Sequence, residues 1–270
     1  MSDPAIADAI SNTDRFYTQV KSLHGFDTLE VRCVINNLLT KTQEETCYLA
    51  TYIRTVGNIE SLLQFNASKD VQAIAMIARA LFELAVDLRL LETTPLGWIK
   101  MTAHADLEKL RLAARIIAFK EANPSVQTDT TVYQKYIEQN SGRVTGLRRS
   151  LWPKDKTPKH WSGLHLGDRC AKLGAPFDQT YAEDYARVSW YAHPGLTGVV
   201  NVPAETFIHV CGYAYHLAVK SYKESLMTMI RVFKLSAAND HIGARLDAAL
   251  KLPFTDAPEQ VEVLRKRAGL

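Results

Sequence analysis

Three side chains that could act together in proton transfer recur at four-residue intervals near the middle of the second half of the chain. They are Tyr185, Ser189 and His193, and this spacing places them on one stripe of an α-helix. Arg187 precedes His193 with five residues between them. A Pro-Gly pair directly follows His193 and ends the expected helix. The stretch is where several chemically capable groups converge by spacing alone.

A second polar pair lies on the most apolar segment of the chain. The range from Val71 to Glu92 is apolar on nearly every side, which predicts a central helix. Its polar residues fall on one stripe: Gln72, Arg79, Glu83 and Asp87. Two interpretations are open. Arg79 and Glu83 form an ion pair on the face that meets water, or their stripe lines a buried site.

The spacing of Arg187 and His193 resembles the signature of the HEPN superfamily, an Arg and a His with four to six intervening residues. HEPN domains are all-helical and are named for higher eukaryotes and prokaryotes nucleotide-binding. The wider pattern is similar to a family of bacterial helical proteins of about this length without an assigned activity. It consists of Arg79-x3-Glu83 and Tyr185-x3-Ser189-x3-His193-Pro194.

The HEPN resemblance implies a metal-independent ribonuclease of a bacterial toxin or phage-defence type, whose site is shared across a homodimer. RNA can be cut by its own 2′-hydroxyl, so the protein need only move protons and bind the phosphate. His193 would be the acid and base, and Arg187 would hold the phosphate. The supporting residues would be Tyr185, Ser189, Arg79 and Glu83. RNA, a second copy of the chain and an antitoxin or other protein are the expected partners.

A second class of function stays open beside the ribonuclease. Val188 follows Arg187, where active HEPN members carry a polar residue. His193 at a helix end could bond the last carbonyls, and Arg187 could pair with Glu183 at four-residue spacing. The alternative is therefore a non-catalytic helical interaction or regulatory protein that binds a small anion or a protein partner.

A basic segment interrupts the helical pattern between residues 141 and 173. From Arg143 to Lys172 it carries eight Lys and Arg residues against two Asp residues, with two Trp and two His interleaved. We predict an irregular basic insertion. It is either a nucleic-acid surface or a solvated loop with its tryptophans docked on the protein. The nucleic-acid contacts would be Arg148, Arg149, Lys154, Lys156 and Lys159.

The composition favours helices over sheets. Apolar residues make up 47% of the 270 residues, and only 13 glycines and 10 prolines are present, which suits long helices rather than many turns. No segment alternates with the period of a strand. We predict an all-α protein, an irregular multi-helix bundle of roughly eight or nine helices with a HEPN-like core. It would be a single helical domain over 1–270, with an exposed C-terminal helix over 256–270.

The sequence offers little for metals, disulfides or membranes. Its four cysteines form no C-x-x-C pair, which indicates a reducing, cytoplasmic location. His209 and His216 lie seven residues apart near one helix face, but the H-E-x-x-H type of zinc pairing is absent. We therefore expect no metal and no cofactor. The chain begins without a signal peptide and has no apolar run of about 18 residues, so no membrane span is expected.

Overall fold

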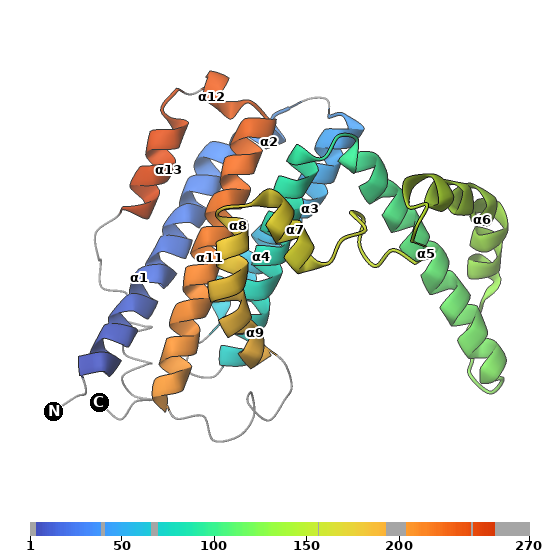
Figure 1. Cartoon of the computed structure of the whole chain (residues 1–270), viewed down its shortest axis with the longest axis horizontal. Helices are drawn as coiled ribbons and strands as arrows, with labels where there is room; N and C mark the ends of the chain where they lie inside the picture. Colours follow the sequence, from blue (N-terminus) through green and yellow to red (C-terminus); the bar gives the residue numbers. More distant parts are fainter. Residues whose placement is uncertain are drawn as a thin grey trace. The chain divides into compact units, whose positions relative to one another are not determined.

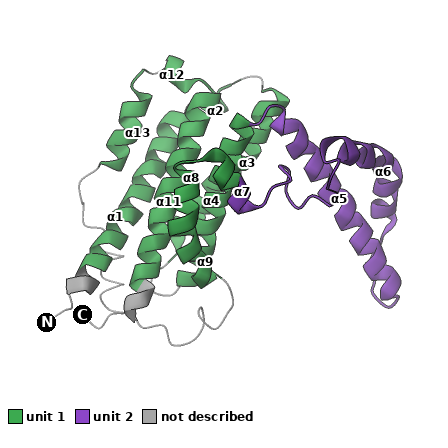
Figure 2. Ribbon diagram, viewed as in Figure 1, with its two compact units in different colours: residues 1–93, 169–270 green, residues 94–168 purple. Residues whose placement is uncertain are grey.

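The computed structural model describes residues 4–38, 41–65, 70–155, 157–192, 204–238 and 240–251. Within these ranges the chain forms helices and no strand, which confirms the all-α prediction. The chain divides into two compact units, coloured separately in Figure 2. Unit 1 contains residues 1–93 and 169–270, and unit 2 contains residues 94–168, where the sequence pattern predicts one domain. The division begins at the Thr94-Pro95 break after the central helix, where Leu96 takes a left-handed backbone conformation.

The core of unit 1 is built on two long helices, α4 (Val71–Thr93) and α11 (Ala204–Val232), which pack along each other (Figure 1). Both are apolar on most sides, so each is surrounded by other elements. Along α4 the side chains of Leu81 and Leu88 are fully buried, and Leu217 and Leu226 are fully buried on α11. The sequence-based prediction of a central helix from residue 71 is confirmed.

Two further long helices cover this pair. Helix α1 (Pro4–Phe26) packs on α11, and α3 (Gln43–Gln64) packs on α4. Helix α3 begins with a capping box, in which the Thr42 hydroxyl accepts from the Glu45 backbone and the Glu45 carboxylate accepts from the Thr42 backbone. The apolar spacing predicts one long helix from residue 28 to residue 65. In the structure a new helix starts at this capping box instead.

Shorter elements complete unit 1. They are η1 (Asp27–Arg32) and η2 (Tyr181–Tyr185), which are π-helical turns, and α2 (Cys33–Asn36), α7 (Leu166–Leu173, shared with unit 2), α8 (Phe177–Thr180), α9 (Ala186–Ala192), α12 (Leu235–Ala238) and α13 (Ile242–Leu250). Helix α9 contacts both α4 and α11, and this places the predicted site segment beside the core pair. The expected C-terminal helix over 256–270 lies outside the described residues.

Unit 2 is a pair of helices, α5 (Gly97–Ala122) and α6 (Thr131–Leu151), followed by an irregular stretch. The sequence pattern predicts that α6 ends near Gln139 and that the irregular insertion begins at residue 141. The helix instead continues to Leu151, because Val144 packs its buried side against α5 and Arg143 pairs with Asp106 at 2.9 Å. The basic segment is therefore helical at its start.

Candidate functional site

The structure describes most, but not all, of the residues predicted to form a site. His193 and Lys156 lie outside the described residues. Tyr185 closes the π-helical turn η2, and Arg187 and Ser189 follow it on α9. The expected single helix is thus a π-helical turn continued by α9. A π-helical turn adds one residue to the usual hydrogen-bonded ring and changes which side chains share a face.

Arg79, Glu83 and Tyr185 come together in a closed polar cluster between α4 and η2. Arg79 donates to the Tyr185 hydroxyl at 2.9 Å, and that hydroxyl donates to Glu83 at 2.8 Å. The Arg79 guanidinium also lies over the Tyr185 ring, 5.2 Å from its centroid. Burial, together with the neighbouring Glu83 carboxylate, raises the pKa of Tyr185, so the phenol stays neutral and donates. Arg79 and Glu83 therefore form the ion pair of the first interpretation, and Tyr185 joins the pair from η2.

Arg187 takes part in a different contact. Its guanidinium lies over the ring of Tyr213 on α11, 5.3 Å from the centroid. Arg187 is exposed and Tyr213 is 38% exposed, so both can reach a ligand from solvent. The described contacts thus put Tyr185 against α4 and Arg187 against α11. The predicted catalytic arginine and its predicted supporting tyrosine face separate neighbours.

Asp184, which the sequence did not single out, faces Lys220 and His216 of α11. Its carboxylate lies 2.7 Å from Lys220 Nζ and 3.7 Å from His216 Nδ1. Burial opposes ionisation of this carboxyl, but the attraction of His216 and Lys220 outweighs it, and the pKa of Asp184 lies below its usual value. Asp184 is therefore a buried, ionised carboxylate that orients a histidine.

His216 lines a cleft between α1 and α11 of about 450 Å³, here named the α1–α11 cleft. The residues that line it are Asp8, Ala9, Asn12, Arg15, Phe16, His209, Gly212, Tyr213 and His216. The Arg15 guanidinium lies 4.8 Å from the Phe16 ring centroid, and the His216 ring contacts the same ring at a tilt of 31°, with centroids 4.6 Å apart. The lining therefore combines one arginine, two histidines and two aromatic rings with a single carboxylate, Asp8.

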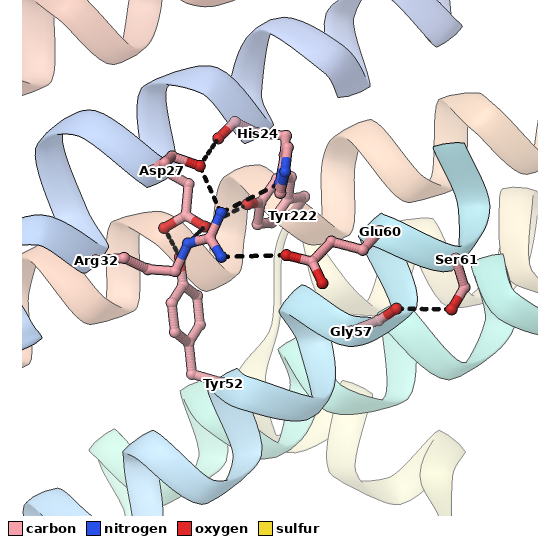
Figure 3. Close-up of polar contacts among 9 residues, drawn as sticks. His24, Asp27, Arg32, Tyr52, Gly57, Glu60, Ser61 and Tyr222 are labelled. Atoms are coloured by element: carbon pink, nitrogen blue, oxygen red, sulfur yellow. Dashed lines mark hydrogen bonds and ion pairs between the residues drawn. The ribbon is translucent and has the colours of Figure 1, made fainter. Parts of the chain in front are cut away.

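A second polar cluster is buried around Asp27 in η1 (Figure 3). The Asp27 carboxylate is fully buried and accepts hydrogen bonds from Tyr52 of α3 and, at 2.7 Å, from Tyr222 of α11. The Nε atom of Arg32 lies 2.8 Å from the same carboxylate. A terminal nitrogen of the same guanidinium, Nη1, lies 3.2 Å from the Glu60 carboxylate. Because these partners come from different parts of the chain, the cluster joins η1, α3 and α11. Protein side chains shield the Asp27 carboxylate from solvent, which favours a structural role.

In the basic segment of unit 2, several charged side chains are exposed to solvent, whereas both tryptophans are buried. Arg149, Lys154 and Lys159 are exposed, whereas Trp152 and Trp161 are only 5% and 4% exposed. The Trp152 indole donates to the Trp161 carbonyl at 3.1 Å. Neither tryptophan is therefore available to stack on a nucleic-acid base. This part of the chain corresponds to the alternative with docked tryptophans, although Lys154 and Lys159 are exposed to solvent.

Metal and membrane features are few in the described ranges. No group of three or more His, Cys, Asp or Glu side chains there could hold a metal ion. The four cysteines are free thiols. Across the same ranges, the helices lack the continuous apolar length that a bilayer crossing requires.

Comparisons of the chain with known protein families, with curated proteins and with solved structures found no match. A function for this chain is therefore inferred from the geometry of the site.

Proposed function

We propose that this protein binds single-stranded RNA along the α1–α11 cleft. The observation that carries the proposal is the Arg187 guanidinium stacked on the exposed ring of Tyr213, which itself lines the cleft. Arg15 and Phe16 repeat the same arrangement on the α1 side. Each pair offers a cation beside an aromatic face on the same surface.

Such pairs match the two repeating parts of a nucleic acid. An arginine forks onto phosphate oxygens with two parallel hydrogen bonds, and an aromatic ring stacks on a base of any sequence. Single strands expose both parts at once, whereas a duplex hides its base faces. The charges near the cleft favour an anionic ligand, since Arg15 and Arg187 outnumber the carboxylate of Asp8.

The HEPN resemblance extends the proposal to metal-independent cleavage. In that extension Arg187 binds the scissile phosphate, His193 moves the proton, and a second copy of the chain completes the site. A toxin or phage-defence role follows from the same resemblance. RNA binding through Arg187 is the part of the proposal that the described geometry supports.

The test is fluorescence anisotropy with a short labelled single-stranded RNA over a series of salt concentrations. We expect saturable binding that weakens with salt. Arg187→Ala should flatten the slope of log affinity against log salt by about 0.7, because the variant neutralises one phosphate fewer than wild type. Arg187→Lys should restore only part of the affinity, because it lacks the planar fork. Arg54→Ala is the matched control, since Arg54 is exposed on α3.

Two results would reject RNA binding at this cleft. One is the absence of binding at low salt, and the other is an equal loss of affinity in the Arg54→Ala and Arg187→Ala proteins. Either result would favour the non-catalytic interaction protein.

A further inference from the structure

We infer that the α1–α11 cleft carries its own proton-transfer pair, His209 and His216, and cleaves the RNA bound between them. This inference rests on the proposed RNA binding. It assigns the chemistry to two residues of α11 that the sequence suggested only as an unsuitable zinc pair. Both line the cleft, and His209 is exposed while His216 is partly buried.

The spacing of the two histidines suits a phosphate group placed between them. They are seven positions apart on one helix, which is two turns or about 10 Å along the axis. Between them lies Gly212, where an added Cβ would approach the Thr13 hydroxyl oxygen at 3.0 Å. Glycine therefore lets the Thr13 side chain of α1 lie close against α11 at this position.

His216 is held in place from behind. Its Nδ1 faces the buried carboxylate of Asp184 at 3.7 Å, and its ring packs against Phe16. Lys220 binds the other oxygen of the same carboxylate at 2.7 Å and fixes its direction. A carboxylate that faces one imidazole nitrogen favours a proton on that nitrogen, and the opposite nitrogen, Nε2, is then the one that exchanges protons. Asp184 is thus a positioning residue for His216.

The arginines around the pair favour an anionic ligand, as a phosphodiester is. Arg15 faces the cleft from α1, and Arg187 reaches its rim at Tyr213. Both arginines can neutralise the charge that builds on the phosphate oxygens during attack. Asp8, the carboxylate in the lining, opposes this attraction.

The reaction balances without any other reactant. The RNA 2′-oxygen forms a bond to phosphorus, and the bond from phosphorus to the 5′-oxygen breaks. One histidine, neutral at the start, takes the 2′-hydroxyl proton, while the other, protonated at the start, gives a proton to the departing 5′-oxygen. The products are a 2′,3′-cyclic phosphate and a free 5′-hydroxyl. Exchange with water then resets the two imidazoles.

The test measures binding and cleavage separately on the same intact protein. Single-stranded RNA is incubated with wild type and with His209→Ala, His216→Ala, Asp184→Asn and the control His241→Ala, all in EDTA, and the product ends are identified by mass spectrometry. His241 is exposed before α13 and does not line the cleft. Each cleft histidine variant should lose about 100-fold or more in cleavage rate with RNA affinity nearly unchanged.

Chemical rescue separates a catalytic role from a structural one. Free imidazole should restore part of the rate in His216→Ala, since it can occupy the vacated space and carry the proton. Asp184→Asn should lower the rate without lowering RNA affinity, and Asp184→Glu should retain more of it. His216→Asn serves as the second variant if the alanine protein does not fold.

The outcomes keep the two proposals apart. RNA that binds but yields no cyclic phosphate would overturn this inference and leave RNA binding standing. Cleavage in His209→Ala or His216→Ala at the rate of His241→Ala would also overturn it. RNA that does not bind at all would reject the proposed function and this inference together.

Discussion

The Tyr222 hydroxyl of α11 donates a hydrogen bond of 2.7 Å to the Asp27 carboxylate, which is 195 positions earlier in the chain. The carboxylate is fully buried, and its partners belong to three separate elements (Figure 3). A buried charge is tolerated only where hydrogen bonds and a counter-ion satisfy it. This contact therefore joins η1 to α11, which is also the helix that carries the cleft histidines.

Tyr222→Phe removes one donor and leaves a lone pair of a buried carboxylate without its partner. We expect a loss of about 1–3 kcal/mol in the free energy of unfolding, measured by urea denaturation. Tyr133→Phe is the control, because Tyr133 lies on α6 outside this cluster and is partly exposed. A Tyr222→Phe protein as stable as the control would show that the Asp27 cluster contributes little.

The pH dependence of stability should show whether folding raises or lowers the pKa of Asp27. Burial raises its pKa more than the hydrogen bonds of Tyr52 and Tyr222 and the charges of Arg32 and His24 lower it. The folded state thus binds this proton more tightly than the unfolded chain, where the pKa is about 3.9. Its contribution to stability is complete below that value and is lost as the pH rises through the folded pKa.

Asp27→Asn cannot lose a proton and so isolates this effect from every other titrating group. We expect wild type to become less stable relative to Asp27→Asn as the pH rises from about 3 to about 7, in urea titrations at each pH. In the opposite trend, wild type would become more stable relative to the variant as the pH rises. That result would mean that the hydrogen bonds and Arg32 lower the pKa of Asp27 more than burial raises it.

The core of unit 1 gives the most direct test of the architecture. Phe82 is 1% exposed and Leu84 is 5% exposed on α4, so truncation of either to Ala should cost about 2–5 kcal/mol in unfolding free energy. Met76→Ala on the same helix is the control, because Met76 is 55% exposed and its truncation should change stability by less than about 0.5 kcal/mol. Equal effects at all three positions would contradict a central α4.

The sequence predicts a feature of this structure well when the residues that form it are close together along the chain. The spacing of apolar residues predicted α4, because helical periodicity is a local property. Arg79, Glu83 and Tyr185 were singled out by spacing within their own helices, and the structure brings the three together. The HEPN-like core and the role of His193 stay predictions.

Other features could not have been predicted from spacing. Asp184 and His216 belong to different helices, and nothing in either segment indicates that they meet. The π-helical turns η1 and η2 leave no local signature comparable to the Thr42–Glu45 capping box. The buried partners of Asp27 likewise depend on how α3 and α11 pack, so their pairing follows from tertiary structure alone.

The basic segment of unit 2 should contribute less to RNA affinity than the cleft arginines do. Its exposed lysines offer phosphate contacts, but Trp152 and Trp161 are buried and provide no ring for a base. We expect the triple variant Lys154/Lys156/Lys159→Ala to weaken anisotropy-detected binding less than Arg15/Arg187→Ala does. A larger loss in the triple lysine variant would move the main RNA surface to unit 2.

The most direct test of the proposed RNA surface is photochemical cross-linking of a thiouridine-containing single-stranded RNA to the intact protein, with the attached peptides identified by mass spectrometry. RNA bound in the α1–α11 cleft predicts cross-links within Asp8–Phe16 and His209–His216, competed by unlabelled RNA and reduced in Arg187→Ala. Cross-links confined to Arg148–Lys159, or none above an unrelated protein of similar charge, would contradict the proposal that this cleft binds RNA.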